Sequence, residues 1–542
     1  MATSNILRGT MLLTSGIFIS KFLGMIYVIP FEWLVGEKGS ALYFYAYNPY
    51  NILLSISTVG VPLAVSKFVA KYNTLGDYET GRRMFKSGIL LMAVTGFIAF
   101  LTLFFSAEFL ATRMLSENGS SGNSVEDATM VIQMVSFALI IIPSMSIVRG
   151  FFQGYESMGP TALSQVVEQI ARIVFLLIAA YLILNVYNGT IAMAVGFATF
   201  AAFIGAIASC FVLFIYWKKR KPYLDKKIQQ QQVSYNLPMK DLFIELFRYA
   251  GPFILVGIAT SLYQLVDQFT FNRTMVDIGF SQSEAENALG SFNFLSHKLV
   301  IIPVTLATGL SLAMLPAITK SYTEQKRDQM LKQMNQSFQI IILFVLPAVV
   351  GLSILSNEAY GSLYGLNNIE TYGALLGWYA PVGIFFALFT VSSAVLQGID
   401  KQKFAVISLS IGLLIKISLN IPFIHLFGAK GAILTTLLTV ATVVTLNMWK
   451  IKTAVNFPLR ELTKRSMLIA IFTTIMGIIV WLLKWGLGFF ISYSDGRLEA
   501  IIVLFVGVLT GILIYLWLSY QSTLLERVLG NRVRVFDRFL KK

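Results

Sequence analysis

The chain has 542 residues, of which 56% are hydrophobic and 13% are charged. Charged residues make up about 25% of an average soluble protein, so this composition excludes a set of soluble domains and indicates a multi-pass membrane protein. The net charge of +15 is typical of Lys and Arg gathered in cytoplasmic loops, and it does not predict nucleic-acid binding. One cysteine and two histidines exclude an internal disulfide and a Cys/His metal cluster.

Fourteen apolar segments along the chain are long enough for membrane helices, each of which needs about 20 residues. None shows the alternation over about ten residues that is typical of membrane β-strands. We therefore predict an all-α polytopic membrane protein. Its expected spans lie near residues 11–30, 43–70, 84–107, 128–152, 162–185, 190–217, 246–272, 290–318, 336–356, 372–397, 404–427, 431–449, 466–490 and 498–520.

Positive charge is distributed unevenly between alternate loops. If the N-terminus is cytoplasmic, most of the 42 Lys and Arg fall in cytoplasmic segments. Examples are the clusters at 218–221, 326–327 and 464–465. The positive-inside rule then predicts a cell-membrane protein with both termini in the cytoplasm.

The sequence also resembles itself weakly. Gln153–Gly154 matches Gln397–Gly398, and the same offset aligns Arg172 with Lys416. Each repeat would contain six spans, so both would enter the membrane from the same side. Parallel repeats of this kind commonly enclose a cavity that opens to alternate sides of the membrane.

The repeat and the charge clusters divide the chain into four predicted regions. These are an N-terminal lobe at 1–217, a basic cytoplasmic linker at 218–245, a C-terminal lobe at 246–450, and two further spans with a basic tail at 451–542. The tail interleaves apolar and basic residues, which suits an amphipathic helix on the inner leaflet; an ordinary positively charged tail is the alternative. Its apolar residues are Leu525, Val528, Leu529, Val535, Phe536 and Phe539.

Ionisable side chains within the predicted spans are the most informative residues, because each costs at least about 2.5 kcal/mol in the membrane centre. Seven of them are candidate site residues, namely Lys21, Lys67, Glu168, Arg172, Asp267, Lys298 and Lys416. Their summed charge is positive. We expect them to face a watery cavity or one another rather than lipid.

Two lysines are candidate ligands for an anion. Lys21 lies near the middle of the first span, and Lys298 lies in the eighth span shortly before Pro303. The alternative for each is a side chain whose ammonium reaches the membrane interface. His297, beside Lys298, either joins the site or hydrogen-bonds a neighbouring helix.

Two further groups of polar residues have two interpretations each. Glu168 and Arg172 are one turn apart and can pair with each other, or they form a cavity wall on which the arginine meets the ligand. Asp267 either holds a cation or pairs with Lys416, and Asn420 is one turn from that lysine. These three residues are candidates for a coupling site or for a static ion pair.

The surplus of cations indicates the charge of the ligand. Phosphate and diphosphate groups bind lysine and arginine through charge-assisted hydrogen bonds, whereas a cavity for cationic drugs would need uncompensated acids. A ligand that also interacts with the membrane would be a phosphate-linked lipid. The chain has no Walker motif, nucleotide-binding glycine loop or zinc signature, so we predict a transporter with no catalytic residues, metal or cofactor rather than an enzyme.

The segment from Arg149 to Arg172, RGFFQGYESMGPTALSQVVEQIAR, resembles a signature of bacterial polysaccharide-biosynthesis membrane proteins. Gly251–Pro252 and Leu396–Gly398 fit the same group, which belongs to the multidrug/oligosaccharidyl-lipid/polysaccharide exporter superfamily. The resemblance covers nearly the whole chain. Within the superfamily the chain resembles the lipid II flippase family of the MurJ and YtgP type, with the stage V sporulation protein B group as a near relative.

This resemblance implies a V-shaped pair of six-helix lobes around a cationic cavity, followed by two spans that form a groove for a lipid tail. It implies that an undecaprenyl-diphosphate-linked peptidoglycan precursor, lipid II, is moved from the inner to the outer leaflet of the bacterial membrane by alternating access without ATP. Lys21 and Lys298 fall on essential arginines of the family. A further family arginine falls on Tyr27 here.

Some relatives bind sodium between span seven and spans eleven and twelve. The resemblance places Asp267 and Asn420 in that site, but Lys416 falls on another ligand position, where its ammonium would take the place of the ion. We therefore expect coupling to the membrane potential or to protonation rather than to sodium.

Several other functions stay open at this point. The chain could flip another polyprenyl-linked polysaccharide unit, act as a cation-coupled drug antiporter, or serve as a non-transporting scaffold of a cell-wall or sporulation complex. A membrane glycosyltransferase would need paired acids in a sizeable outer loop, and the outer loops are short. Expected partners are the glycolipid substrate, membrane lipids and cell-wall synthesis proteins.

Overall fold

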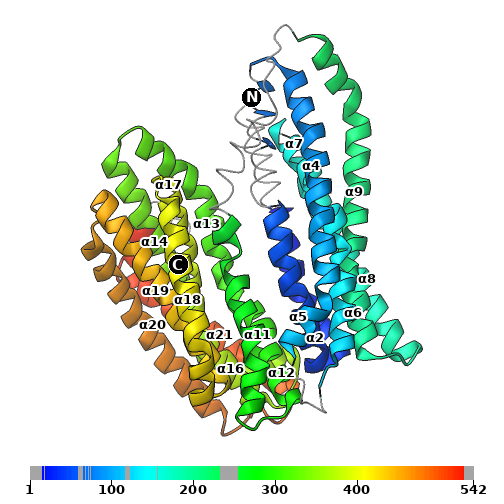
Figure 1. The fold of residues 1–542 in the computed structure, drawn as a ribbon. Helices are drawn as coiled ribbons and strands as arrows, with labels where there is room; N and C mark the ends of the chain where they lie inside the picture. The colour runs from blue at the N-terminus through cyan, green and yellow to red at the C-terminus, as the bar shows by residue number, and fades with distance from the viewer. Residues whose placement is uncertain are drawn as a thin grey trace. The chain divides into compact units, whose positions relative to one another are not determined.

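The computed structural model is helical in all of its regular structure (Figure 1), with no strand among the residues it describes. This confirms the predicted all-α fold. The described residues are 15–16, 19–58, 65–66, 69–70, 72–73, 75–115, 122–155, 157–231 and 254–529.

Within those residues, twelve helices are long and apolar enough to cross a membrane, and the predicted count of fourteen is not confirmed. Residues 19–30 of the first predicted span and 43–58 of the second fall in one helical stretch, Ile19–Thr58. This stretch is broken at Gly36, whose φ of 66° is readily adopted only by glycine. In place of the seventh predicted span the structure describes α11 (Ala259–Asp277), which is rich in polar side chains and is not among the twelve.

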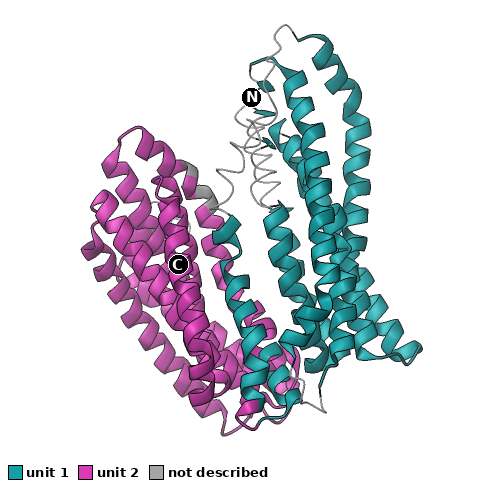
Figure 2. Ribbon diagram, in the orientation of Figure 1, with its two compact units in different colours: residues 1–276, 280–290 teal, residues 277–279, 291–542 magenta. Residues whose placement is uncertain are grey.

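The chain divides into two compact units, residues 1–276 with 280–290 and residues 277–279 with 291–542 (Figure 2). Within unit 1, α8 packs along α9 and α4 packs along α7. The helices of unit 1 are α2 (Val28–Thr58), α4 (Tyr78–Phe105), α5 (Ala107–Met114), α6 (Val125–Ser136), α7 (Ala138–Gly154), α8 (Met158–Tyr181), the π-helical η1 (Leu182–Val186), α9 (Ile191–Gln229), α11 and α12 (Gln282–Gly290).

The basic segment after the sixth predicted span continues as helix. α9 has 39 residues, about 58 Å at 1.5 Å per residue, which exceeds the roughly 30 Å hydrocarbon core of a bilayer. Its last turns are fixed to unit 1, because Asp225 accepts a hydrogen bond from Arg82 of α4 and the ring of Trp217 stacks on Phe85 at 4.9 Å. The first part of the expected linker, up to Gln229, is therefore an ordered extension of the span.

Unit 2 contains the remaining helices, among which α13 packs along α17, α18 along α19, and α14 along α20. They are the π-helical η2 (Ser291–Ser296), α13 (His297–Thr323), α14 (Arg327–Ile354), α15 (Ser356–Tyr364), α16 (Ile369–Tyr379), α17 (Val382–Gly398), α18 (Gln402–Phe427), α19 (Ala429–Val455), α20 (Leu459–Leu487), α21 (Arg497–Gln521) and α22 (Leu524–Leu529).

The described part of the C-terminal tail packs on protein. Leu524, Leu525 and Val528 of α22 are 1–3% exposed and belong to an apolar cluster with Ile469 and Met476 of α20. These three apolar side chains are thus not free to insert into the inner leaflet, and the interfacial helix stays a prediction for the rest of the tail. Residues 530–542, with Val535, Phe536 and Phe539, lie outside the described residues.

The two units do not coincide with the lobes expected from the repeat. The segment from Ala259 to Gly290 packs with the N-terminal helices. In that segment Asn272 donates hydrogen bonds to the Tyr45 hydroxyl (2.6 Å) and the Met114 carbonyl (2.8 Å). The repeat-based division stays a prediction about the sequence, whereas the contacts group the seventh segment with unit 1.

Candidate substrate-binding site

Lys21 lies on the wall of a small polar cavity in unit 1. The cavity has a volume of about 200 Å³ and is lined by Ser20, Lys21, Arg149, Gln165, Glu168 and Gln169. Ser20 donates a hydrogen bond of 3.5 Å to the Gln165 carbonyl, which joins the first helix to α8. The Lys21 side chain itself is exposed, so its ammonium is accessible to a ligand at this cavity.

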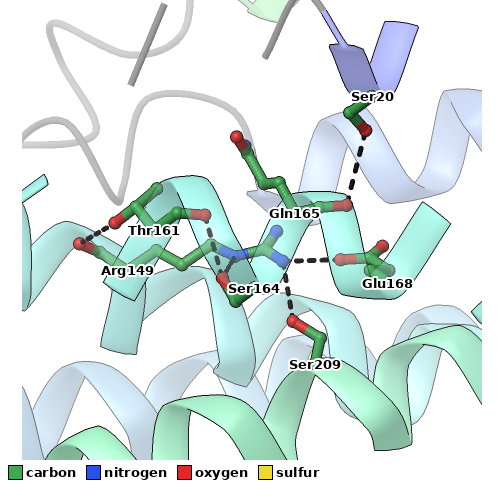
Figure 3. A network of polar contacts seen from close by, with 7 residues as sticks. All are labelled: Ser20, Arg149, Thr161, Ser164, Gln165, Glu168 and Ser209. Atoms are coloured by element: carbon green, nitrogen blue, oxygen red, sulfur yellow. Dashed lines mark hydrogen bonds and ion pairs between the residues drawn. The ribbon is translucent and has the colours of Figure 1, made fainter. Parts of the chain in front are cut away.

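Arg149 of α7 organises the polar groups beside this cavity (Figure 3). Its Nη2 donates to Glu168 Oε2 at 2.6 Å and to Ser209 Oγ at 2.7 Å. Its Nε donates to Ser164 Oγ at 2.9 Å. Both side chains of the ion pair are largely buried, at 13% and 23% exposed, so the pair is a fixed part of the wall.

The partner of Glu168 differs from the expected one. The sequence spacing suggested Arg172, but the structure pairs Glu168 with Arg149, because α7 and α8 pack together and bring the two side chains into reach. The sequence analysis named Arg149 only as the first residue of the family signature and left it out of the site. One feature of the sequence could have indicated Arg149: it is the first residue of the most specific motif in the chain.

Arg172 instead lies against a row of tyrosines on the first long helical stretch. Its Nη2 donates to the Tyr43 hydroxyl at 2.9 Å, and its guanidinium carbon is 4.8 Å from the ring centroid of Tyr47. The hydroxyls of Tyr27 and Tyr43 are 3.1 Å apart. Tyr27 is thus linked through Tyr43 to a cation from α8.

Asp267 is buried in unit 1, with 1% of its surface exposed. Its neighbour Gln268 accepts a hydrogen bond from Asn48 Nδ2 at 2.9 Å and donates one to the Phe44 carbonyl at 2.9 Å. These contacts fix α11 against α2. They hold the carboxyl group of Asp267 at a defined position within the unit.

Lys416 of unit 2 is fully buried. Its Nζ donates to the Ala432 carbonyl at 3.0 Å and to Thr436 Oγ1 at 2.8 Å. Asn420, one turn further on α18, is also fully buried. Since Asp267 and Lys416 belong to different units, their pairing stays a prediction.

Lys298 is half-buried in unit 2 and follows the π-helical turn η2. Such turns are often found at functional sites. Its Nζ lies 5.7 Å from the ring centroid of Phe294. The adjacent His297 has its Nδ1 2.9 Å from the Tyr379 hydroxyl, which fits the predicted hydrogen bond to a neighbouring helix. Lys67 lies outside the described residues.

An apolar groove of about 530 Å³ lies within unit 2. Its walls come from α13, α14, α15, α20 and α21, and almost every lining side chain is aliphatic or aromatic. Examples are Pro303, Phe344, Met476, Val508 and Ile512. A groove of this kind suits a hydrocarbon chain better than a polar group.

Family models match most of the chain. The model described as polysaccharide biosynthesis protein matches residues 6–322, and the model described as MatE matches residues 252–421. The chain belongs to the polysaccharide biosynthesis protein family. Its class is a multi-pass cell-membrane transporter, and the prediction that it is no enzyme is confirmed, since a relative that it matches over its full length is a flippase.

The individual comparisons narrow this class. Lipid II flippase MurJ of Bacillus subtilis (strain 168) is 47% identical over 538 residues, which cover 99% of this chain and 99% of that protein. A solved structure of lipid II flippase MurJ in an inward closed conformation has a TM-score of 0.66 at 19% identity, covering 96% of this chain and 99% of that one. An inward-facing multidrug resistance MATE family transporter has a TM-score of 0.59 at 14% identity, covering 84% and 95%. The two structures show the shared fold.

Proposed function

We propose that this protein flips lipid II, the polyprenyl-diphosphate-linked peptidoglycan precursor, from the inner to the outer leaflet by alternating access. The observation that carries the proposal is the 47% identity to the lipid II flippase MurJ over 99% of both chains. An identity of this size over the full length supports the same transported lipid. Alternating access is supported by the likeness to MATE transporters.

Cationic side chains in both units are suited to a diphosphate. In unit 1, Lys21 is exposed at its polar cavity, and Arg149 is neutralised by Glu168. Among the described residues that line this cavity, the charge without a carboxylate partner is therefore that of the lysine. In unit 2, Lys298 supplies a second ammonium. We assign these two lysines to the phosphate oxygens, because charge-assisted hydrogen bonds to a lysine are stronger than neutral ones.

Arg172 and Glu168 have supporting roles in this proposal. Glu168 fixes Arg149 beside Lys21. Arg172, fixed by Tyr43 and Tyr47, adds a positive charge to the same helix. Both residues thereby contribute to the electrostatic potential of the site. The proposal assigns no ATP, metal or other cofactor to them.

The groove in unit 2 is assigned to the polyprenyl tail. The isoprene units would pack against its apolar lining instead of against bilayer lipid while the diphosphate is bound by the lysines. Its walls include the last two spans, α20 and α21, as the family resemblance implies.

Coupling is assigned to Asp267, Lys416 and Asn420. The MATE-like fold supports ion-coupled transport. Lys416 already donates to the oxygens of Ala432 and Thr436, which are the kind of ligands sodium would use, so we favour the membrane potential or a proton. Moving one charge through 100 mV supplies about 2.3 kcal/mol.

The orientation follows from the charge distribution. Both termini are assigned to the cytoplasm, since this places the basic end of α9 and the 326–327 and 464–465 clusters inside. In this orientation lipid II would enter from the cytoplasmic leaflet. Cell-wall synthesis proteins on the outer side would receive it.

The proposal is tested by depleting the protein in cells and measuring which leaflet contains lipid II. We expect inward-facing lipid II to accumulate and the wild-type gene to reverse this. If the protein flips another polyprenyl-linked unit, depletion would leave the distribution of lipid II unchanged while a different precursor accumulated. If it is a scaffold, the Lys21→Ala variant would rescue depleted cells as well as the wild type does. Either result would contradict the proposal.

A further inference from the structure

A second pocket in unit 2 has neither Lys21 nor Lys298 among its lining residues. It has a volume of about 320 Å³ and is formed by α15, the end of α20, the connection to α21 and the start of α21. It combines one carboxylate and one ammonium with four aromatic rings. These residues are Glu358, Lys484, Trp481, Trp485, Phe489 and Tyr493.

The carboxylate of Glu358 is only partly satisfied. The residue is 0% exposed, and its Oε2 accepts a hydrogen bond of 3.0 Å from Lys484 Nζ. Its Oε1 is buried and has no hydrogen-bond partner in the described part of the chain. A buried acceptor without a hydrogen bond costs free energy, so a ligand with an N–H or O–H donor would be favoured at this wall of the pocket.

The ammonium of Lys484 can donate a further hydrogen bond to a ligand, beside the acceptor on Glu358. Of its three donors, one is used by Glu358 and one by the Ile354 carbonyl at 3.0 Å. The Nζ also lies 5.6 Å from the ring centroid of Tyr493, near the limit for a cation–π contact. The third donor is thus able to bind an anionic oxygen close to the acceptor on Glu358.

The aromatic residues indicate the depth of the pocket in the membrane. Trp481, Trp485 and Phe489 are 55%, 60% and 68% exposed at the end of a membrane-spanning helix. Trp side chains in such positions gather at the level of lipid headgroups. Trp481 directly follows Val480, a residue of the apolar groove, so a headgroup in this pocket would have its chains beside apolar protein surface.

We propose that this pocket binds the phosphoethanolamine headgroup of a zwitterionic phospholipid. The primary ammonium donates to Glu358 Oε1 and a phosphate oxygen accepts from Lys484 Nζ. A choline headgroup has no N–H to donate. A glycerol headgroup offers Glu358 Oε1 only neutral hydroxyl donors, which bind a carboxylate more weakly than an ammonium does. The site thus goes beyond the transported substrate: it selects a bilayer lipid that stays bound to the protein.

The test measures lipid binding to the purified full-length protein. Dioleoyl phosphatidylethanolamine, phosphatidylcholine and phosphatidylglycerol are titrated in detergent, and bound lipid is counted by native mass spectrometry. We expect phosphatidylethanolamine to bind about tenfold more tightly than the other two, as one added charge-assisted hydrogen bond would give. Glu358→Gln should abolish this preference, whereas Glu370→Gln, an exposed carboxylate of the same unit, should keep it.

Equal binding of the three lipids, or tighter binding of phosphatidylglycerol, would overturn the proposal. So would a preference that survives Glu358→Gln. If that variant does not fold, because Lys484 loses its partner, Trp485→Ala decides the question. Its ring is 60% exposed, so its removal should spare the fold and weaken phosphatidylethanolamine binding several-fold; unchanged binding would reject the site.

Discussion

Arg149 of α7 and Glu168 of α8 form an ion pair with 2.6 Å between Nη2 and Oε2, on the wall of the cavity that Lys21 also lines. Two serine hydroxyls, of Ser164 and Ser209, accept hydrogen bonds from the same guanidinium. The pair therefore fixes two helices of unit 1 to each other, and Glu168, the carboxylate in the cavity lining, is taken up by Arg149 rather than by Lys21.

Removing one partner of this pair should destabilise the protein. We expect Arg149→Ala or Glu168→Ala to lower the free energy of unfolding by about 1–3 kcal/mol, because a partly buried charge is left without its partner. A double-mutant cycle in thermal unfolding measures the coupling. The exposed pair of Lys326 and Glu324, at 59% and 38% exposed, is the control, with an expected coupling below about 1 kcal/mol. Equal coupling in both pairs would contradict this account.

The C-terminal helix provides a second test. Leu525→Ala should lower the free energy of unfolding by about 2–5 kcal/mol, because a side chain 3% exposed leaves a cavity in the core of unit 2. Glu526→Ala, on the exposed side of the same helix, should change it by less than about 0.5 kcal/mol. Thermal unfolding in detergent measures both. If α22 lay on lipid instead, the two variants would have similar stabilities.

The apolar groove predicts a difference between two matched substitutions on α21. Val508→Trp should fill the groove and reduce flipping of lipid II about tenfold, since each CH₂ group of the tail kept from burial costs about 0.8 kcal/mol. Leu509→Trp is the control, because Leu509 has the same 43% exposure and does not line the groove. Transport is compared in proteoliposomes. Equal rates for the two variants would reject the groove as the tail site.

The coupling residues predict a change in driving force. Asp267→Asn and Lys416→Met each remove a charge that is buried in its own unit, so fewer charges can respond to the membrane potential. We expect flipping by either variant to depend less on an imposed potential than flipping by the wild type. Rates are measured with and without a potassium diffusion potential. An unchanged voltage dependence in both variants would remove these residues from the coupling mechanism.

Composition was enough to predict the helical fold. Residue type selected Lys21, Glu168 and Lys298 as candidates, because a charge in an apolar span has few structural explanations, and their roles stay predictions. The partner of Glu168 was not predictable, since it depends on how α7 packs against α8. The tail shows the same limit: an amphipathic pattern fits lipid and protein equally well, and only packing places Leu525 and Val528 in a core. The break at Gly36 is a local backbone conformation, with a φ of 66°, that a hydropathy pattern does not contain.

The most direct measurement of the central claim is the initial rate of lipid II flipping by the purified protein in proteoliposomes, with a fluorescent headgroup quenched from outside. We predict that Lys21→Ala and Lys298→Ala each reduce the rate about 10- to 100-fold, as the loss of a charge-assisted hydrogen bond would, and that Lys→Arg at each position retains most of it. Lys320→Ala, an exposed lysine at the end of the same helix as Lys298, should flip at the wild-type rate. Wild-type rates in both Lys21→Ala and Lys298→Ala would contradict a diphosphate site built on these two ammonium groups.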